Sequence, residues 1–181
     1  MIYVFLAEGF EEIEALTPVD CLRRAGKTVQ TVGVGGKVIA GAHGIAVQAD
    51  ISAEEIVLDA QLEMIVLPGG MPGTLNLGQS DAVKRAIEYC VQEKRWIAAI
   101  CAAPSILGKM ELLRGKKATC YPGFESELKG ALTSRKAVVT DGKFITGRGP
   151  GAAMDFALKL TEVLLSKEVR KTLAEKMVYD G

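Results

Sequence analysis

The sequence carries no net charge and no long hydrophobic run, and each absence excludes a class of partner. Its 22 Lys and Arg residues balance 22 Asp and Glu residues, so electrostatics give no reason to expect binding to nucleic acid or to an anionic membrane. The uninterrupted apolar stretches, such as the opening run at residues 1–7, are far shorter than the roughly 20 residues that span a bilayer. We therefore expect neither a membrane partner nor a nucleic-acid partner.

The opening segment also lacks the features of a secretory signal. It has no basic start and no small-residue cleavage site, and it runs into Glu8, Glu11, Glu12 and Glu14. We therefore predict a cytoplasmic location. A length of 181 residues with 49% hydrophobic and 24% charged residues is typical of one soluble domain, so we expect a single domain over residues 1–181.

Histidine is scarce, and the cysteines show no motif. Cys21, Cys90, Cys101 and Cys120 form no C-x-x-C pair and no zinc-ligand spacing, so we expect free thiols in a reducing compartment. His43 is the only histidine. A zinc site would need widely scattered residues, and any Cys–His pair would have to use this position. We expect no metal and no cofactor.

Short apolar runs alternate with amphipathic segments along the chain. Strands are predicted at 1–7, 28–34, 63–67, 96–100, 117–121 and 136–146, and helices at 10–25, 80–94, 102–109, 151–165 and 167–176. Residues 35–49 are too short and glycine-rich for a helix and indicate a hairpin. The alternation predicts an α/β sandwich around a mainly parallel sheet. Ligands of such sheets lie beyond the carboxyl ends of the strands.

Cys101 stands where one of these strands gives way to a helix, in WIAAICAAPSILGK at 96–109. Small residues, Ala99 and Ala103, lie two positions to either side, as a nucleophile elbow requires. Backbone amides and the helix dipole favour a thiolate there, so we predict a pKa below the free value of about 8.5. The alternative is a buried small hydrophobic residue, which is the interpretation we prefer for Cys21, Cys90 and Cys120.

Glu14 is the acidic residue that we single out in the segment 7–20. Glu8, Glu11 and Glu12 are expected on a solvated face near a helix N-terminus. Glu14 lies beside an apolar stripe that includes Ile13, facing the sheet edge, where partial burial would let it hold a proton. Such a group could act as a general acid and base.

Two glycine-rich junctions complete the predicted site. In MIVLPGGMPG at 64–73, Gly69 and Gly70 could turn backbone amides toward an anion, although a tight turn without a ligand is the alternative. ITGRGPGAAMDF at 145–156 breaks the G-x-G-x-x-G pattern because Ala152 stands at the third glycine position. We therefore expect no nucleotide site. Arg148 could bind an anion, but a structural ion pair is the preferred interpretation.

Four motifs together resemble the ThiJ/PfpI superfamily, in the branch of the parkinsonism-associated protein deglycase and its bacterial homologues. They are LAEGFEEIEALTPVDCLRRAG (6–26), VLPGGMPG (66–73), AAICAAPSIL (98–107) and TGRGPG (146–151). The resemblance covers nearly the whole chain. It implies a flavodoxin-like α/β sandwich, a homodimer, a reactive Cys101, a protonated Glu14 that hydrogen-bonds it, and an anion pocket lined by Gly69, Gly70 and Ala102.

One position departs from many relatives. Tyr121, in TCYPGF at 119–124, stands where peptidase-type members carry a histidine about twenty residues after the cysteine. This removes the candidate Cys–His pair and argues against peptidase or amidotransferase-like hydrolysis. His43 lies in the predicted hairpin, at a position that the resemblance places toward a dimer interface. It could reach a neighbouring subunit's pocket, but a surface or interface role is the preferred interpretation.

The resemblance leaves two functions open. In the first, the chain is a glyoxalase- or deglycase-type enzyme that acts without a cofactor on a small carbonyl substrate or a glycated protein. In the second, Cys101 is oxidised, and the protein works as an oxidative-stress sensor or redox-regulated chaperone. Cys120 is a candidate resolving thiol for that second function.

Overall fold

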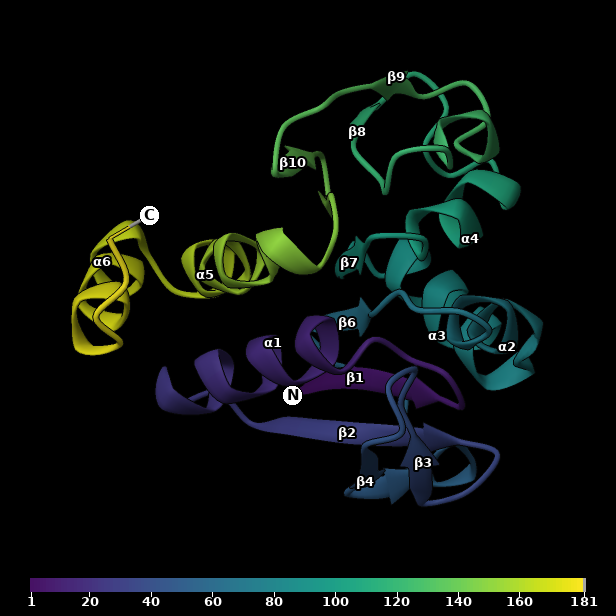
Figure 1. The fold of residues 1–181 in the computed structure, drawn as a ribbon, viewed down its shortest axis with the longest axis horizontal. Coiled ribbons are helices and arrows are strands. Elements are labelled where there is room, and N and C mark those ends of the chain that lie inside the picture. The colour runs from purple at the N-terminus through teal and green to yellow at the C-terminus, as the bar shows by residue number, and fades with distance from the viewer. Residues whose placement is uncertain (181) are drawn as a thin grey trace.

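The computed structural model describes residues 1–180, and a seven-stranded sheet forms its centre (Figure 1). Neighbouring strands in the sheet are β10 (Val138–Asp141), β11 (Phe144–Gly147), β7 (Trp96–Ile100), β6 (Met64–Leu67), β1 (Ile2–Ala7), β2 (Val29–Val34) and β5 (Ile51–Ser52). All adjacent pairs are parallel except β10 with β11. The predicted mainly parallel α/β architecture is confirmed.

The central strand β1 packs on both of its faces, because successive side chains of a strand point to opposite sides. Ile2 and Val4 belong to one buried cluster, whereas Tyr3 and Phe5 belong to the other. The first cluster includes residues of α1 (Glu12–Arg24) and α5 (Ala153–Leu164), and the second includes residues of α2 (Gly73–Gln79), α3 (Asp81–Gln92) and α4 (Pro104–Lys109). Helix α6 (Lys167–Lys176) packs against α5 (Figure 1). The result is a three-layer sandwich.

Helix α1 differs from its predicted amphipathic pattern at one position. Ala15, Val19 and Leu22 are buried against the sheet, as an apolar stripe requires, but Ile13 is 54% exposed. Ile13 is therefore not part of the stripe that was expected to flank Glu14. Glu14 itself lies on the inner side of the helix and is completely buried.

The predicted helices are present, with ends that differ by one or two residues at most termini, and one helix was missed. Helix α2 has two glycines and an asparagine in seven residues, so its intrinsic propensity is low. Burial of Thr74 and Leu77 stabilises it. Short 3-10 helices occur at Ala53–Glu55, Glu125–Glu127 and Pro150–Ala152. No helix within residues 1–180 is long and apolar enough to cross a bilayer.

The predicted hairpin at 35–49 is confirmed by the antiparallel strands β3 (Val38–Ala40) and β4 (Ala46–Gln48). Two other predictions need correction. The strand expected at 117–121 shortens to β8 (Lys117–Ala118), which pairs with β9 (Leu132–Thr133) outside the main sheet. The strand expected at 136–146 is a hairpin, because Gly142 at φ +58° turns the chain between β10 and β11.

We predict that the centre of the sheet dominates stability. Phe5→Ala removes a fully buried ring and should lower the free energy of unfolding by about 3–5 kcal/mol. The control Val57→Ala alters a side chain that is 60% exposed, and it should change the free energy of unfolding by less than about 0.5 kcal/mol. Chemical denaturation measures both values. Similar losses in the two variants would contradict this assignment of the core.

Candidate functional site

Cys101 follows the last residue of β7 in a left-handed backbone conformation, with φ of +63°. Its amide donates to the Gly147 carbonyl oxygen at 3.0 Å, and its own carbonyl oxygen accepts from the Tyr121 amide at 2.9 Å. These bonds hold the residue in a conformation that costs a non-glycine residue energy. Such a turn is the nucleophile elbow that the sequence predicts. The helix after it begins later than expected, at Pro104, so a three-residue turn separates the thiol from α4.

Glu14 reaches the same place from α1. The Gly69 amide, just beyond β6, donates to its carboxyl oxygen Oε2 at 2.9 Å. A methyl group at Gly69 would lie 2.6 Å from the Cys101 Cβ and 2.7 Å from that Oε2 atom. Only glycine therefore lets the acid and the thiol approach each other across this strand end.

The contact between Glu14 and Cys101 shifts the pKa values of both groups. The other carboxyl oxygen, Oε1, is buried and has no hydrogen-bond partner among residues 1–180, although a hydrogen bond with the thiol lowers the Glu14 pKa. The thiol and the carboxyl group are therefore close enough to interact. Hydrogen bonds of this kind often tighten only during reaction.

Burial is the largest influence on both groups. It raises the pKa of Glu14 to about 7, and the nearby charge of Glu11 acts in the same direction. It also raises the pKa of Cys101 to about 12, with further increases from the charge and hydrogen bond of Glu14. The lowered thiol pKa that we predicted from the sequence is therefore wrong. The buried sulfur therefore resists ionisation.

Two backbone amides lie beside the sulfur. Hydrogen bonds from Ala102 and Gly70 lower the Cys101 pKa, against the larger effect of burial. Both residues were predicted to line an anion pocket. The Gly69 amide was predicted there too, but it is already bonded to Glu14. Cys101 is 9% exposed, so only a small part of the residue is accessible from solvent.

Three further residues were singled out in the sequence, namely Tyr121, Arg148 and Cys120. Tyr121 is 46% exposed and touches the site through its backbone bond to Cys101. Arg148 donates from Nη1 to the Arg135 carbonyl oxygen at 2.5 Å and makes no ion pair among residues 1–180, so the expected ion pair is corrected to a backbone contact. Cys120 is buried, as are Cys21 and Cys90, and all four thiols are free.

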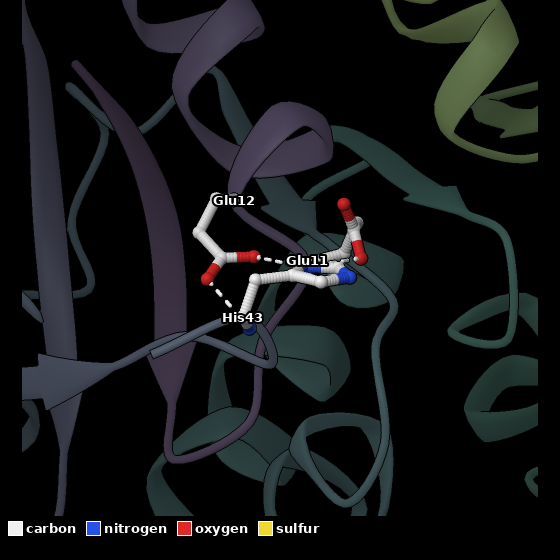
Figure 2. Close-up of side chains that lie close together, drawn as sticks. All are labelled: Glu11, Glu12 and His43. Atoms are coloured by element: carbon white, nitrogen blue, oxygen red, sulfur yellow. Dashed lines mark hydrogen bonds and ion pairs between the residues drawn. The ribbon is translucent and has the colours of Figure 1, made fainter. Parts of the chain in front are cut away.

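Glu11 and Glu12 differ from the solvated face predicted for them. They are 9% and 5% exposed, whereas Glu8 is exposed as expected. His43, in the loop between β3 and β4, lies against both: its Nδ1 atom is 2.8 Å from Glu12 Oε2 and 3.6 Å from Glu11 Oε2 (Figure 2). The pair with Glu12 raises the pKa of His43. Sequence spacing gave no signal for this cluster, because 31 residues separate His43 from Glu12.

The chain is similar to known proteins over most of its length. The DJ-1/PfpI family model matches residues 1–163. Protein DJ-1 homolog B of Arabidopsis thaliana is 40% identical over 166 residues, which is 90% of this chain but 38% of that protein, so the chain spans well under half of this relative. A deglycase of Pyrococcus abyssi is 33% identical over 153 residues, covering 83% of this chain and 90% of the relative.

A solved structure agrees with these matches. Oxidised DJ-1 of Toxoplasma gondii superposes with a TM-score of 0.94 at 35% identity, covering 99% of this chain and 98% of that one. The flavodoxin-like fold implied by the sequence motifs is therefore confirmed, and so is the resemblance itself. The chain belongs to the DJ-1/PfpI family.

Proposed function

We propose that the protein is a cofactor-independent enzyme that acts on reactive dicarbonyls or their glycation adducts, with Cys101 as nucleophile and Glu14 as proton shuttle. The observation that carries the proposal is the buried contact between this thiol and this carboxyl group, with the Gly69 amide fixing the carboxyl in place. The deglycase name of the Pyrococcus abyssi relative supports the same class of reaction.

The first step is addition of the sulfur to an aldehyde carbon. Glu14, as carboxylate, takes the thiol proton while the carbon–sulfur bond forms and the carbonyl π electrons move to oxygen. The raised pKa of Glu14, about 7, suits a base that must later return a proton near neutral pH. The new alkoxide would lie near the Gly70 and Ala102 amides, which can donate to it.

The later steps return the thiol. Glu14 first passes the thiol proton to the alkoxide, which gives a neutral hemithioacetal and frees the carboxylate. For methylglyoxal, this carboxylate then takes the proton of the former aldehyde carbon and delivers it to the neighbouring carbon. The hydroxyl proton moves to the former ketone oxygen, and the product is a lactoyl thioester. Water then cleaves the thioester, giving lactate and the free thiol. The net change is methylglyoxal plus water to lactic acid, so no oxidant or cofactor is consumed.

The small exposure of Cys101 sets a limit on substrate size. With 9% of the residue accessible and Glu14 fully buried, a small aldehyde reaches the sulfur more easily than an adduct on a folded protein surface. We therefore propose free small dicarbonyls as preferred substrates and glycated proteins as weaker ones.

A sensor function is the second candidate. The unpartnered Glu14 Oε1 beside Cys101 could, when protonated, donate to an oxygen of a cysteine sulfinate, and the Toxoplasma gondii relative has been solved in an oxidised form. Each of two peroxide molecules would transfer one oxygen to the sulfur and leave as water. A redox-regulated chaperone would be a consequence of the same oxidation.

A Cys–His hydrolase is disfavoured by the place of the chain's only histidine. His43 is bound to Glu12, and Tyr121 occupies the position where peptidase-type relatives carry theirs. The cytoplasmic location, the single-domain organisation and the homodimer stay predictions.

We predict that turnover of methylglyoxal depends on both members of the pair. Cys101→Ser should abolish lactate release, and Glu14→Gln should lower it by about 100-fold or more, as loss of a general acid–base group does. Cys21→Ser and Glu88→Gln make the same chemical changes elsewhere and should retain wild-type rates. Substantial turnover in either site variant would reject the mechanism.

We also predict that alkylation of Cys101 by iodoacetamide follows the ionisation of Glu14. Below a pH of about 7 the carboxyl group keeps its own proton and cannot take that of the thiol, so the rate should rise as pH increases through about 7. In Glu14→Gln the thiol must give its proton to water. Its pKa loses the increases due to Glu14 but keeps the larger increase due to burial, so the midpoint should still lie above that of the wild type. Mass spectrometry assigns the modified cysteine. An identical midpoint in both proteins would show that the two groups do not share a proton.

Mild peroxide separates the two candidate functions. If the protein is a sensor, mass spectrometry should find two added oxygens at Cys101 and none at Cys21 or Cys90, in a protein that releases no lactate from methylglyoxal. Equal oxidation of all four cysteines would defeat the sensor function. Lactate release with the variant pattern given above would favour the enzyme.

A further inference from the structure

A cluster of one imidazole and two carboxylates lies outside the proposed catalytic pair. Glu11 and Glu12 stand at the start of α1, and His43 stands in the loop between β3 and β4. One ligand atom from each residue lies within 4.8 Å of the others. Figure 2 shows the imidazole ring lying between the two carboxylates. Together these residues offer one nitrogen and two oxygen ligands to a common centre.

The charges of this cluster are not balanced by the protein. Burial of a carboxylate is costly unless a cation or several hydrogen bonds compensate for it. Glu11 and Glu12 are buried, yet among residues 1–180 no lysine or arginine forms an ion pair with either, and His43 is their single cationic neighbour. A single imidazole therefore faces two carboxylates.

Glu11 provides a second and independent observation. Its residue surface is 9% exposed, its carboxylate accepts no hydrogen bond within the described part of the chain, and its nearest partner is His43 Nδ1 at 3.6 Å. The side chain is 12% exposed, so its carboxylate is open to solvent or to an ion rather than enclosed by protein donors. This side chain is directed at the imidazole and has unused acceptor capacity there.

Glu12 and His43 are already held in position. Glu12 Oε1 accepts from the His43 backbone amide at 2.8 Å, and Oε2 lies 2.8 Å from the ring nitrogen Nδ1. The Glu12 carboxyl group also fills the space where Gly41 would carry a side chain. The loop is thereby fixed against the helix, so two of the three ligand atoms are preorganised.

We propose that Glu11, Glu12 and His43 form a binding site for a divalent transition-metal ion such as Zn²⁺. Bonds of about 2.1 Å to nitrogen and oxygen place neighbouring ligand atoms roughly 3.0–3.4 Å apart. The distances from Nδ1 to the two carboxylates, 2.8 and 3.6 Å, bracket this separation. A small rotation of Glu11 would complete the coordination, and His43 would bind through neutral Nδ1 with its proton on Nε2.

The ligand types favour a transition ion over a hard cation. Imidazole suits Zn²⁺, Co²⁺ and Ni²⁺, whereas Mg²⁺ and Ca²⁺ prefer oxygen alone. A divalent ion with neutral His43 and two carboxylates also gives a neutral centre. An open cavity of about 440 Å³, lined also by Ile13, Ile45 and Pro150, adjoins the three ligands, so water or a small ligand could complete the coordination. The ion would join the β3–β4 loop to the start of α1.

The single histidine makes the test direct. In protein labelled with ¹⁵N-histidine, the imidazole nitrogens of His43 are the only ones present, so each titration reports on this residue alone. At mildly alkaline pH, one equivalent of Zn²⁺ should shift the Nδ1 resonance strongly and leave Nε2 protonated. A Cys101→Ser background excludes zinc bound by the reactive thiol. Excess Mg²⁺ should leave both resonances unchanged.

Matched variants separate a metal site from a structural ion pair. Glu11→Gln should weaken Zn²⁺ binding in calorimetry by more than the roughly 10–100-fold expected for loss of an outer-shell partner. Its thermal midpoint without metal should stay close to the wild-type value, because the Glu11 side chain makes no hydrogen bond among residues 1–180 and its backbone bonds are unchanged. Glu8→Gln, a charge loss in the same segment, should bind Zn²⁺ as the wild type does. Zn²⁺ should also raise the melting temperature of the wild type but not of Glu11→Gln.

Three results would overturn the proposal: an Nδ1 resonance that does not respond to excess Zn²⁺, unchanged affinity in Glu11→Gln, or equal weakening in Glu8→Gln. None of these measurements uses turnover of a carbonyl substrate. Failure of the metal site would therefore leave the proposed function of Cys101 and Glu14 unaffected, and failure of that function would leave this site unaffected.

Discussion

The close approach of three backbone segments at Gly69 is the constraint on which the site depends. Strands β7, β6 and β1 are neighbours in the sheet, so their carboxyl ends bring Cys101, Gly69 and the segment leading to α1 to one edge. Because Gly69 has no side chain, the thiol and the Glu14 carboxyl group meet across it. The same amide that ends β6 then fixes the carboxyl group. The order of the strands and the absence of a side chain at Gly69 thus determine which groups meet at this site.

Burial has opposite consequences for the two partners of this contact. It makes Glu14 a weaker acid that can hold a proton near neutrality, and it makes Cys101 a weaker acid that resists ionisation in isolation. The Cys101 thiol must release a proton before it can react, and the nearby Glu14 carboxylate is a group that could accept it. The proposed function depends on this coupling, because a thiol with a raised pKa needs a neighbouring base to become a nucleophile.

Much of the site could be predicted from local sequence. The junction around Cys101 is a short apolar strand followed by small residues and Pro104, and such a junction places its nucleophile at a sheet edge whatever the rest of the fold does. The doubly covered sheet follows from alternation of strands and helices. The dipeptide Asp141–Gly142 is also a local signal for the turn between β10 and β11, but the strand prediction at 136–146 overlooked it.

What could not be predicted depends on contacts between distant segments. The thiol pKa is set by how deeply Cys101 is covered and by a carboxyl group 87 positions away in a different element, and no spacing rule reports that balance. The four glutamates of this segment look alike in sequence, yet their surroundings differ. Glu8 is exposed, and the Glu11 side chain makes no hydrogen bond among residues 1–180. Glu12 accepts a hydrogen bond from the β3–β4 loop, and Glu14 accepts one from the Gly69 amide beside Cys101. Only tertiary packing distinguishes them.

The left-handed backbone at Cys101 restricts what could ever replace the sulfur. At φ of +63° a β-branched side chain meets steric strain of about 1–3 kcal/mol, whereas an unbranched one is tolerated. Serine can therefore replace Cys101 without refolding the turn, whereas threonine adds strain there. The conformation of this single residue therefore favours an unbranched side chain at the elbow and disfavours a secondary alcohol.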